Sequence, residues 1–418
     1  MNKKHNVIAS VAKQSLAFIA AASLAFGLAA CGDDSSSGPS TNGDDEEISS
    51  SSEDGQSSSS DEGGQSSSSV EETSSSSNAL SSSSIDKVNV SLTGAYFASD
   101  YTTGELRWID KDGKISEKKL DFFQDSRVAV NGADLFVMQA KGKDNITLIN
   151  PEKIETEGEK AVVWQVALDK ESNPIDMAFN SDTTAWVALE NADSLIQIST
   201  KNGKILQSIK TKDFNNEGAT APHVADLAFD NGKLYAVFAR YDASWVYPNG
   251  LLAVYDASTG KLQTKVELKT HNPKNVIVSD GNVFVATQGD YNADSGTDAD
   301  ENRGLEKVDL EKKTSELFVS GKTLGGGIWQ LAAEDGVAYA CILKAWGAQL
   351  LVKIDLTSGK VESIKGLSDP EFVAVKDGVV YAADRTYGSE KVYVVKDGKA
   401  SALTMPKGAI APYNIALF

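Results

Sequence analysis

A block of four residues, in the order apolar, aromatic, apolar, apolar, recurs seven times across residues 86–418. Its aromatic members lie 40, 50, 49, 49, 55 and 42 residues apart, and they are Tyr96, Phe136, Trp186, Tyr235, Phe284, Tyr339 and Tyr381. A repeat of this length is near that of a four-stranded propeller blade and is too long for leucine-rich or ankyrin repeats. We therefore expect seven copies of one supersecondary unit.

Short segments of alternating polarity flank each block. In the fifth copy, residues 276–278 precede the turn Asp280-Gly281, and in the fourth copy Thr259-Gly260-Lys261 ends the strand that follows the block. Asp-Gly turns close two-residue hairpins, and period-two alternation is typical of half-buried strands. No helical pattern of ten residues or more appears. The sequence therefore predicts an all-β fold, a seven-bladed β-propeller over residues 86–418.

The two ends of the repeat region complement each other. The copy around Tyr96 lacks its leading strand, whereas residues 412–418 form an apolar strand that no further copy follows. We predict that this C-terminal strand is the innermost strand of the blade formed by residues 94–120 and that it closes the ring. Radial repetition of this kind leaves few exposed sheet edges.

The first 31 residues have the features of an export signal. Lys3 and Lys4 precede an apolar run from Leu16 to Ala30, which has signal-peptide length and is too short to span a bilayer comfortably. The run ends in Leu28-Ala29-Ala30-Cys31, which resembles the lipobox of bacterial lipoproteins. This resemblance implies a signal peptide over residues 1–30 and an acylated Cys31, while the alternative is an ordinary secretory signal. Gly32 resembles the signal for outer-membrane export, which places the domain either facing the periplasm or exposed at the surface.

Residues 31–85 are expected to be a disordered tether. Residues 32–84 include 24 serines and 12 acidic residues and no basic residue. Such a composition cannot offset the entropy of ordering, and a flexible chain of this length spans about 40 Å. The whole chain has a net charge of −19 without a basic block, which argues against nucleic acid as a partner. We expect a monomer that meets the membrane through its lipid anchor alone.

The repeat resembles a known group of propellers. Its order is proline, apolar strand, Asp-Gly turn, aromatic strand, and a hairpin of the type Ile-Asp-x-x-Ser/Thr-Gly-Lys; it is clearest in residues 222–262, 273–310, 329–361 and 370–399. This pattern resembles the YVTN/YncE-like seven-bladed propellers. Residues 126–165 depart from it, because Asn150-Pro151-Glu152 replaces the Gly-Lys hairpin. Relatives of this group include surface lipoproteins that capture corrinoids beside a TonB-dependent transporter, which implies one alternative function.

Aromatic side chains predominate in the loops that a propeller brings to one face. These loops join strands two and three of a blade, or one blade to the next. We expect a ligand-binding face made of Tyr101, Arg240, Tyr241, Trp245, Tyr247, Tyr291, Lys344, Trp346, Arg385 and Tyr387 from the first kind of loop, and of His223, His271, Trp329 and Tyr413 from the second. Exposed aromatic residues with polar tips mark binding surfaces. The alternative is that these rings pack between blades.

A polar position precedes the apolar part of each inner strand. Its occupants are Arg127, Asp176, Asp226, Asn275, Gln330, Asn414 and, as the single apolar member, Phe372. We expect the polar ones to line the mouth of the central channel, where they need partners, water or a bound solute. Calcium-dependent lactonases share this fold class, so a propeller enzyme of that type is a second alternative function.

The longest insertion, in the fifth blade, is acidic. Oxygen ligands at positions 1, 3, 5, 9 and 12 of the loop match a calcium loop of the EF-hand type. These positions hold Asp290, Asn292, Asp294, Asp298 and Glu301. We expect either Ca²⁺ at this loop or a solvated acidic segment.

Nothing in the sequence forms a recognisable catalytic constellation. Beyond residue 31 there are two histidines, His223 and His271, and no serine or cysteine stands in a nucleophile motif. We therefore expect a non-catalytic, lipid-anchored propeller of the cell envelope that binds a nutrient, a glycan or an envelope protein through its aromatic face.

Overall fold

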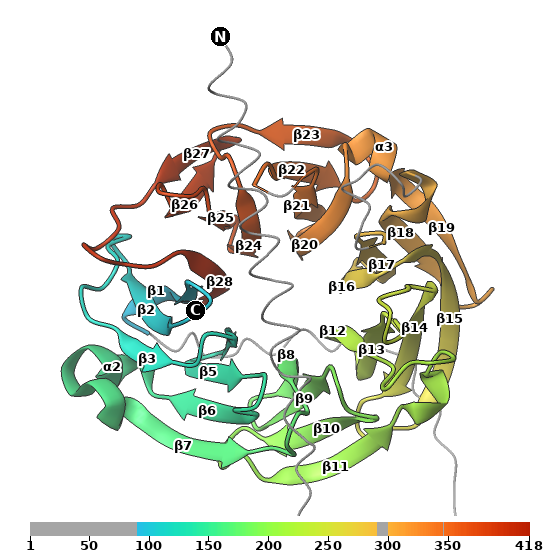
Figure 1. Cartoon of the computed structure of the whole chain (residues 1–418), viewed down its shortest axis with the longest axis horizontal. Helices are drawn as coiled ribbons and strands as arrows, with labels where there is room; N and C mark the ends of the chain where they lie inside the picture. Colours follow the sequence, from blue (N-terminus) through green and yellow to red (C-terminus); the bar gives the residue numbers. More distant parts are fainter. Residues whose placement is uncertain (1–89, 291–299, 346) are drawn as a thin grey trace, which may run out of the picture. The chain divides into compact units, whose positions relative to one another are not determined.

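The computed structural model describes residues 90–290, 300–345 and 347–418, which form seven antiparallel four-stranded sheets set radially around an axis (Figure 1). The prediction of an all-β, seven-bladed propeller is confirmed. The predicted signal peptide, Cys31 and nearly all of the tether lie outside the described residues. No helix in the described ranges is long and apolar enough to cross a membrane.

The blades follow one another along the chain, and the strands of each blade are named from the inner to the outer one. Blade 1 holds β28 (Pro412–Leu417), β1 (Leu92–Ser99), β2 (Gly104–Asp110) and β3 (Leu120–Phe122); blade 2 holds β4 (Ser126–Asn131), β5 (Asp134–Gln139), β6 (Asn145–Ile149) and β7 (Val162–Ala167). Blade 3 holds β8 (Pro174–Ser181), β9 (Thr184–Leu189), β10 (Ser194–Ser199) and β11 (Ile205–Lys210); blade 4 holds β12 (Val224–Asp230), β13 (Lys233–Phe238), β14 (Asn249–Asp256) and β15 (Leu262–His271).

The remaining blades have the same order. Blade 5 holds β16 (Pro273–Ser279), β17 (Asn282–Thr287), β18 (Gly304–Asp309) and β19 (Thr314–Ser320); blade 6 holds β20 (Gly327–Glu334), β21 (Val337–Leu343), β22 (Leu350–Asp355) and β23 (Val361–Ile364). Blade 7 holds β24 (Pro370–Lys376), β25 (Val379–Asp384), β26 (Lys391–Lys396) and β27 (Lys399–Ala402). Short helical segments are α2 (Pro151–Glu157), α3 (Gly321–Leu324), η1 (Gly158–Ala161), η2 (Lys212–Phe214) and η4 (Asp300–Asn302).

The ring is closed by the C-terminal strand, as the sequence predicted. Strand β28 pairs antiparallel with β1, so that Tyr96 lies opposite Ile415 and Phe97 opposite Asn414; in Figure 1 the red β28 and the blue β1 lie in one blade. Gly94 permits this close approach, because a Cβ atom there would lie 2.7 Å from the carbonyl oxygen of Ala416. Residues from the two ends of the propeller region therefore share one sheet.

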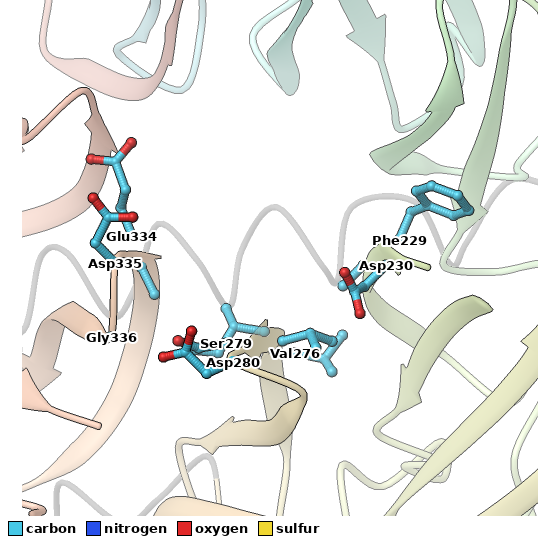
Figure 2. Close-up of a pocket in the computed structure, with 12 residues that line it drawn as sticks. Phe229, Asp230, Val276, Ser279, Asp280, Glu334, Asp335 and Gly336 are labelled. Atoms are coloured by element: carbon cyan, nitrogen blue, oxygen red, sulfur yellow. The ribbon is translucent and has the colours of Figure 1, made fainter. Parts of the chain in front are cut away.

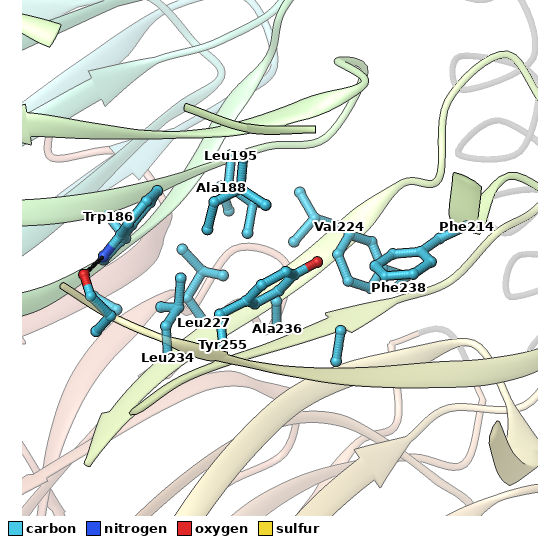
Figure 3. Packing of buried hydrophobic residues seen from close by; sticks show 14 of the residues in the cluster. Trp186, Ala188, Leu195, Phe214, Val224, Leu227, Leu234, Ala236, Phe238 and Tyr255 are labelled. Atoms are coloured by element: carbon cyan, nitrogen blue, oxygen red, sulfur yellow. Dashed lines mark hydrogen bonds between the residues drawn. The ribbon is translucent and has the colours of Figure 1, made fainter. Parts of the chain in front are cut away.

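The repeated aromatic residue packs between blades. Trp186 of β9 is fully buried in a hydrophobic cluster between blades 3 and 4. Phe238 and Tyr255 of blade 4 belong to the same cluster (Figure 3). Its indole Nε1 donates to the carbonyl oxygen of Ala257 at 3.1 Å, which satisfies the polar atom of the buried ring. The spacing of the repeat therefore reflects the spacing of the interfaces between blades.

The departure at Asn150-Pro151-Glu152 is a helix. The side chain of Asn150 accepts from the backbone N–H of Glu152 at 3.0 Å, and Pro151 stands in the first turn, where its missing N–H is not needed. Helix α2 ends at Gly158, whose φ of 59° favours glycine. Ile154 is buried in a cluster with Leu92 and Trp108, so this segment packs against blade 1.

Candidate binding site at the channel mouth

The polar residues predicted at the channel mouth connect neighbouring blades. Each uses one side-chain atom on the backbone of the next inner strand. The bonds are Asn414 Oδ1 from Val128 N (2.5 Å), Arg127 Nη1 to Ile175 O (3.2 Å), Asp176 Oδ2 from Leu227 N (2.9 Å), Asp226 Oδ2 from Val276 N (2.9 Å), Asn275 Oδ1 from Leu331 N (2.8 Å) and Gln330 Oε1 from Val373 N (3.1 Å). Six of the seven blade boundaries thus have a side-chain-to-backbone bond; in five the side chain accepts from a backbone N–H, and at Arg127 it donates to a carbonyl oxygen. The partners that these residues require are supplied by the protein itself.

The two carboxyl groups of this ring stand next to each other along it. Burial raises the pKa of Asp176, and burial together with the neighbouring Asp176 raises the pKa of Asp226 well above its ordinary value. Arg127 lowers both values through its positive charge but does not outweigh the burial. These groups therefore act mainly as hydrogen-bonding members of the scaffold.

A β-bulge lies directly before the ring residue in six inner strands. The extra residues are Ile175, Ala225, Lys274, Trp329, Glu371 and Tyr413. Because a bulge re-aims a side chain, this position is suited to furnish the mouth of a channel. The sequence pattern identified Trp329 and Tyr413 as loop aromatics but missed Lys274 and Glu371, which stand at the same position of their blades.

Arg385 joins the seventh blade boundary, at which Phe372 has no polar atom. Its Nη1 donates to the carbonyl oxygens of Ala411 (3.1 Å) and Pro412 (3.2 Å), and its Nη2 donates to that of Ser99 (3.1 Å). Its Nε lies 3.2 Å from Glu371 Oε2. Only 9% of Arg385 is exposed, so this guanidinium, expected on the ligand face, is engaged in closing the ring.

A pocket of about 120 Å³ opens at the mouth above blades 3 to 6. Among the residues predicted for the ligand face, it brings together His223, Tyr241, Trp245, Tyr247 and Trp329. It adds residues that the sequence pattern did not single out, among them Glu190, Asn272 and Lys274. Loops within blades and loops between blades both contribute, as expected for one face of a propeller.

Three of the rings form a stack. The centroids of His223 and Tyr241 lie 3.7 Å apart with an interplanar angle of 8°, and those of Tyr241 and Trp245 lie 4.9 Å apart at 11°. Tyr247, tilted by 53° against Tyr241, is buried and packs against the stack. The Tyr241 hydroxyl donates to Glu190 Oε1 at 3.1 Å, and Asn173 Nδ2 donates to Glu190 Oε2.

The backbone holds His223 in a conformation that favours asparagine or glycine. Its φ is 51°, and the equivalent residues before the inner strands of blades 3 and 5 are Asn173 (57°) and Asn272 (51°). Because asparagine adopts this positive-φ conformation in blades 3 and 5, the conformation alone does not require a histidine at position 223. Trp245, at the other end of the stack, also has a positive φ, 61°. Non-glycine residues in this region cluster at functional sites.

Burial sets the protonation of the pocket. It lowers the pKa of His223, although the charge of Glu190 and a hydrogen bond to the Glu190 backbone act in the opposite direction. It also lowers the pKa of Lys274 to about 8, with Arg127 adding to the effect and Glu190 opposing it. The pKa of Tyr241 is raised by burial and then by Glu190. At neutral pH the pocket therefore combines a neutral imidazole, a phenol and an ammonium group.

The other residues predicted for the ligand face are dispersed. Tyr101 and Tyr413 lie against Arg385, with ring centroids 5.1 and 5.7 Å from its Cζ. His271 Nδ1 lies 3.1 Å from Asp290 Oδ1. Arg240 donates to the carbonyl oxygens of Phe214 and Asn249, whereas Lys344 and Tyr387 are exposed. Tyr291 and Trp346 lie outside the described residues.

The predicted calcium loop falls largely outside the description as well. Asn292, Asp294 and Asp298 belong to the undescribed segment, and of the five proposed ligands Asp290 and Glu301 are described. Within the ranges that the structure covers, no group of three or more His, Cys, Asp or Glu residues could hold a metal ion. Calcium at this loop stays a prediction.

A second and larger cavity, of about 390 Å³, lies at the turns between the first and second strands of blades 4 to 6. Figure 2 shows Asp230 on one side and Glu334 with Asp335 on the other. These acids have local roles: Asp335 forms a positive-φ turn, and Glu334 accepts from the backbone N–H groups of Asp377 and Gly378. We place the candidate site in the smaller pocket, because stacked rings and buried polar atoms converge there.

Fold and site together define a seven-bladed propeller with an aromatic pocket at one mouth of its channel. No protein-family model and no curated protein sequence matches the chain. Among solved structures, it is similar to the hydrazine synthase of Kuenenia stuttgartiensis (16% identity over 73% of this chain and 96% of that one, TM-score 0.49). It is also similar to AztD of Citrobacter koseri (14% over 78% and 98%, TM-score 0.48) and to the computationally designed protein Ika8 (16% over 69% and 76%, TM-score 0.44).

Proposed function

We propose that this chain is a lipid-anchored protein of the cell envelope that binds a small ligand in the mouth pocket without transforming it. The observation that carries the proposal is the stack of His223, Tyr241 and Trp245, which faces a pocket shared with Trp329 and Lys274. Aromatic walls with a few convergent polar groups are typical of small-molecule sites. A volume of about 120 Å³ suits a single ring or a terminal unit of a larger ligand.

The N-terminal sequence supports the cellular part of the proposal. A Leu-Ala-Ala-Cys sequence at residues 28–31 and a serine-rich tether give the propeller an anchor and reach. Acylation with two or more chains anchors a protein stably. A tethered propeller can capture ligands at a distance from the membrane, whereas an enzyme acting on a freely diffusing substrate would gain little from such a tether.

Replacing Trp245 and Trp329 together by alanine is expected to abolish ligand binding, because the pocket loses both of its indole rings. A panel of sugars, corrinoids and peptides is screened by thermal shift with residues 86–418, since a ligand of the native state raises the melting temperature. Hits are then measured by isothermal titration calorimetry in the wild type and in the double variant.

Tyr387→Ala is the matched control for the loss of an aromatic ring. Tyr387 is 91% exposed and does not line the pocket, so its variant should bind as the wild type does. A hit that survives the double substitution would place the site elsewhere. Turnover of a lactone in the presence of Ca²⁺ would contradict the non-catalytic part of the proposal, and corrinoid binding lost in the double variant would favour the corrinoid-capture alternative.

A further inference from the structure

The mouth pocket has two chemically different sides. Glu190 and His223, from blades 3 and 4, contribute hydrogen-bond acceptors on one side, whereas Lys274 of blade 5 contributes donors and Trp329 of blade 6 an indole plane on the other. A ligand that fits both sides donates hydrogen bonds at one end and carries acceptors or negative charge at the other. These two sides define the class of ligand more closely than the proposed function does. The inference rests on that proposed function.

On the first side, a buried acceptor has no partner. His223 is 5% exposed, and its Nδ1 has no hydrogen-bond partner among the described residues, although the imidazole bonds the Glu190 backbone. A neutral imidazole whose other nitrogen carries the proton offers Nδ1 as an acceptor. Leaving a buried polar atom unpaired is costly, so a ligand hydroxyl that donates to Nδ1 gains affinity.

On the second side, a half-buried ammonium group lies over an indole ring. Lys274 Nζ is 5.3 Å from the centroid of Trp329. In the part of the chain that the structure describes, none of the ion pairs within 4.0 Å includes Lys274. Glu190 attracts this ammonium group from the first side of the pocket, and Arg127 repels it more weakly. A ligand anion at this side compensates a positive charge that the protein has partly withdrawn from water.

We propose that the ligand unit held in this pocket is an acidic sugar, a hexuronate, whose ring packs against the tryptophans, whose carboxylate bonds Lys274 and whose hydroxyls donate to His223 Nδ1 and Glu190. Hydroxyl groups supply the donors that the first side requires, and the carboxylate supplies the charge that the second side requires. The faces of a sugar ring match flat aromatic walls. The volume of about 120 Å³ admits one such unit rather than a chain of them.

The direct test compares sugars that differ only at one carbon. Glucuronate and galacturonate are titrated into residues 86–418 beside glucose and galactose, which carry CH₂OH in place of the carboxylate. We expect each uronate to bind about tenfold or more tightly than its neutral counterpart, as for a charge-assisted hydrogen bond. Equal affinities, or no binding of either uronate, would overturn the proposal without requiring any variant.

Variants of Lys274 separate charge from proton linkage. Lys274→Met is expected to lose about tenfold or more in uronate affinity, whereas Lys344→Met, at an exposed lysine of the same face, should not change it. Because an anion raises the pKa of Lys274 from about 8, the wild type should take up protons on binding uronate between pH 8 and 9. Calorimetry in buffers of different ionisation enthalpy measures this uptake. Lys274→Arg keeps the positive charge and should bind uronate without proton uptake.

Failure of this inference is distinguishable from failure of the proposed function. If a neutral sugar, a corrinoid or a peptide binds and the Trp245 and Trp329 double variant loses it, the pocket is the site and the hexuronate assignment is wrong. If no compound of the panel binds in a manner that depends on those tryptophans, both proposals fail. Uronate binding without proton uptake in the wild type would remove Lys274 as the contact of the carboxylate.

Discussion

Deletion of residues 412–418 is expected to abolish the cooperative unfolding of the propeller. Strand β28 is the inner strand of blade 1, Ile415 is buried, and Asn414 holds the backbone of Val128 in blade 2. Without these residues, β1 becomes an open edge and two blade boundaries lose their bonds. Thermal unfolding of residues 86–411 followed by circular dichroism should show no single sharp transition, in contrast to residues 86–418.

The control is a deletion at the other end. Removing residues 1–85 takes away the serine-rich segment, whose composition cannot form a packed core, and should leave the melting temperature of the remaining protein unchanged. A protein without residues 412–418 that melts in one sharp transition near the temperature of the complete propeller would contradict the importance of this closure.

Arg385→Met is expected to destabilise the propeller by about 3–5 kcal/mol at pH above 7, where Glu371 is ionised, which is the usual cost of removing one partner from a buried ion pair. The substitution leaves Glu371 without its cation and the carbonyl oxygens of Ser99, Ala411 and Pro412 without their shared donor. Urea unfolding followed by tryptophan fluorescence measures the change. Lys344→Met removes an exposed cation from an equivalent loop and should change the free energy by no more than about 0.5 kcal/mol. A similar small change in Arg385→Met would mean that the closure does not depend on the guanidinium.

The pH dependence of stability tests the same contact from the side of Glu371. Burial raises its pKa to about 7 in the folded protein, although Arg385 lowers it, so the folded state holds this proton more tightly than the unfolded state, whose pKa is near 4.5. The contribution of Glu371 to stability is therefore full below pH 4.5 and is lost as the pH rises to 7. In Glu371→Gln this loss is absent, and the melting temperature relative to wild type should rise between pH 4.5 and 7. A constant difference across that range would contradict the raised pKa.

The architecture could be predicted from the sequence because one physical requirement repeats. The aromatic residue of the repeat is buried against the next blade, as Phe136, Trp186 and Phe284 show in blades 2, 3 and 5, whereas Tyr96 of blade 1 packs against blade 7. Closure of the ring could be predicted because the first repeat lacks its leading strand and residues 412–418 supply one. Helix α2 was not predicted, because Asn150 and Pro151 show only that a hairpin is missing there, and the helix depends on the burial of Ile154.

The candidate site was predictable only in part. Loop aromatics pointed to Trp245 and Trp329 because topology alone places such loops on one face. Lys274 and Glu190 were missed, since an isolated lysine or glutamate looks like any surface residue until a bulge or a tyrosine hydroxyl reveals its place. Arg385 was expected on the ligand face. Residue type alone does not show whether an arginine is available to a ligand or, like Arg385, already donates hydrogen bonds to three backbone carbonyl oxygens.

The chain of bonds around the channel mouth determines how the propeller carries mechanical load. Tension from the N-terminal side enters at Leu92 in β1, and a pull on a ligand in the pocket enters at blades 3 to 6. Side-chain hydrogen bonds at six blade boundaries transmit this force from one blade to the next, so the load is distributed around the ring of blades. At the boundary next to Phe372, Arg385 makes this connection instead, through hydrogen bonds to the carbonyl oxygens of Ser99, Ala411 and Pro412.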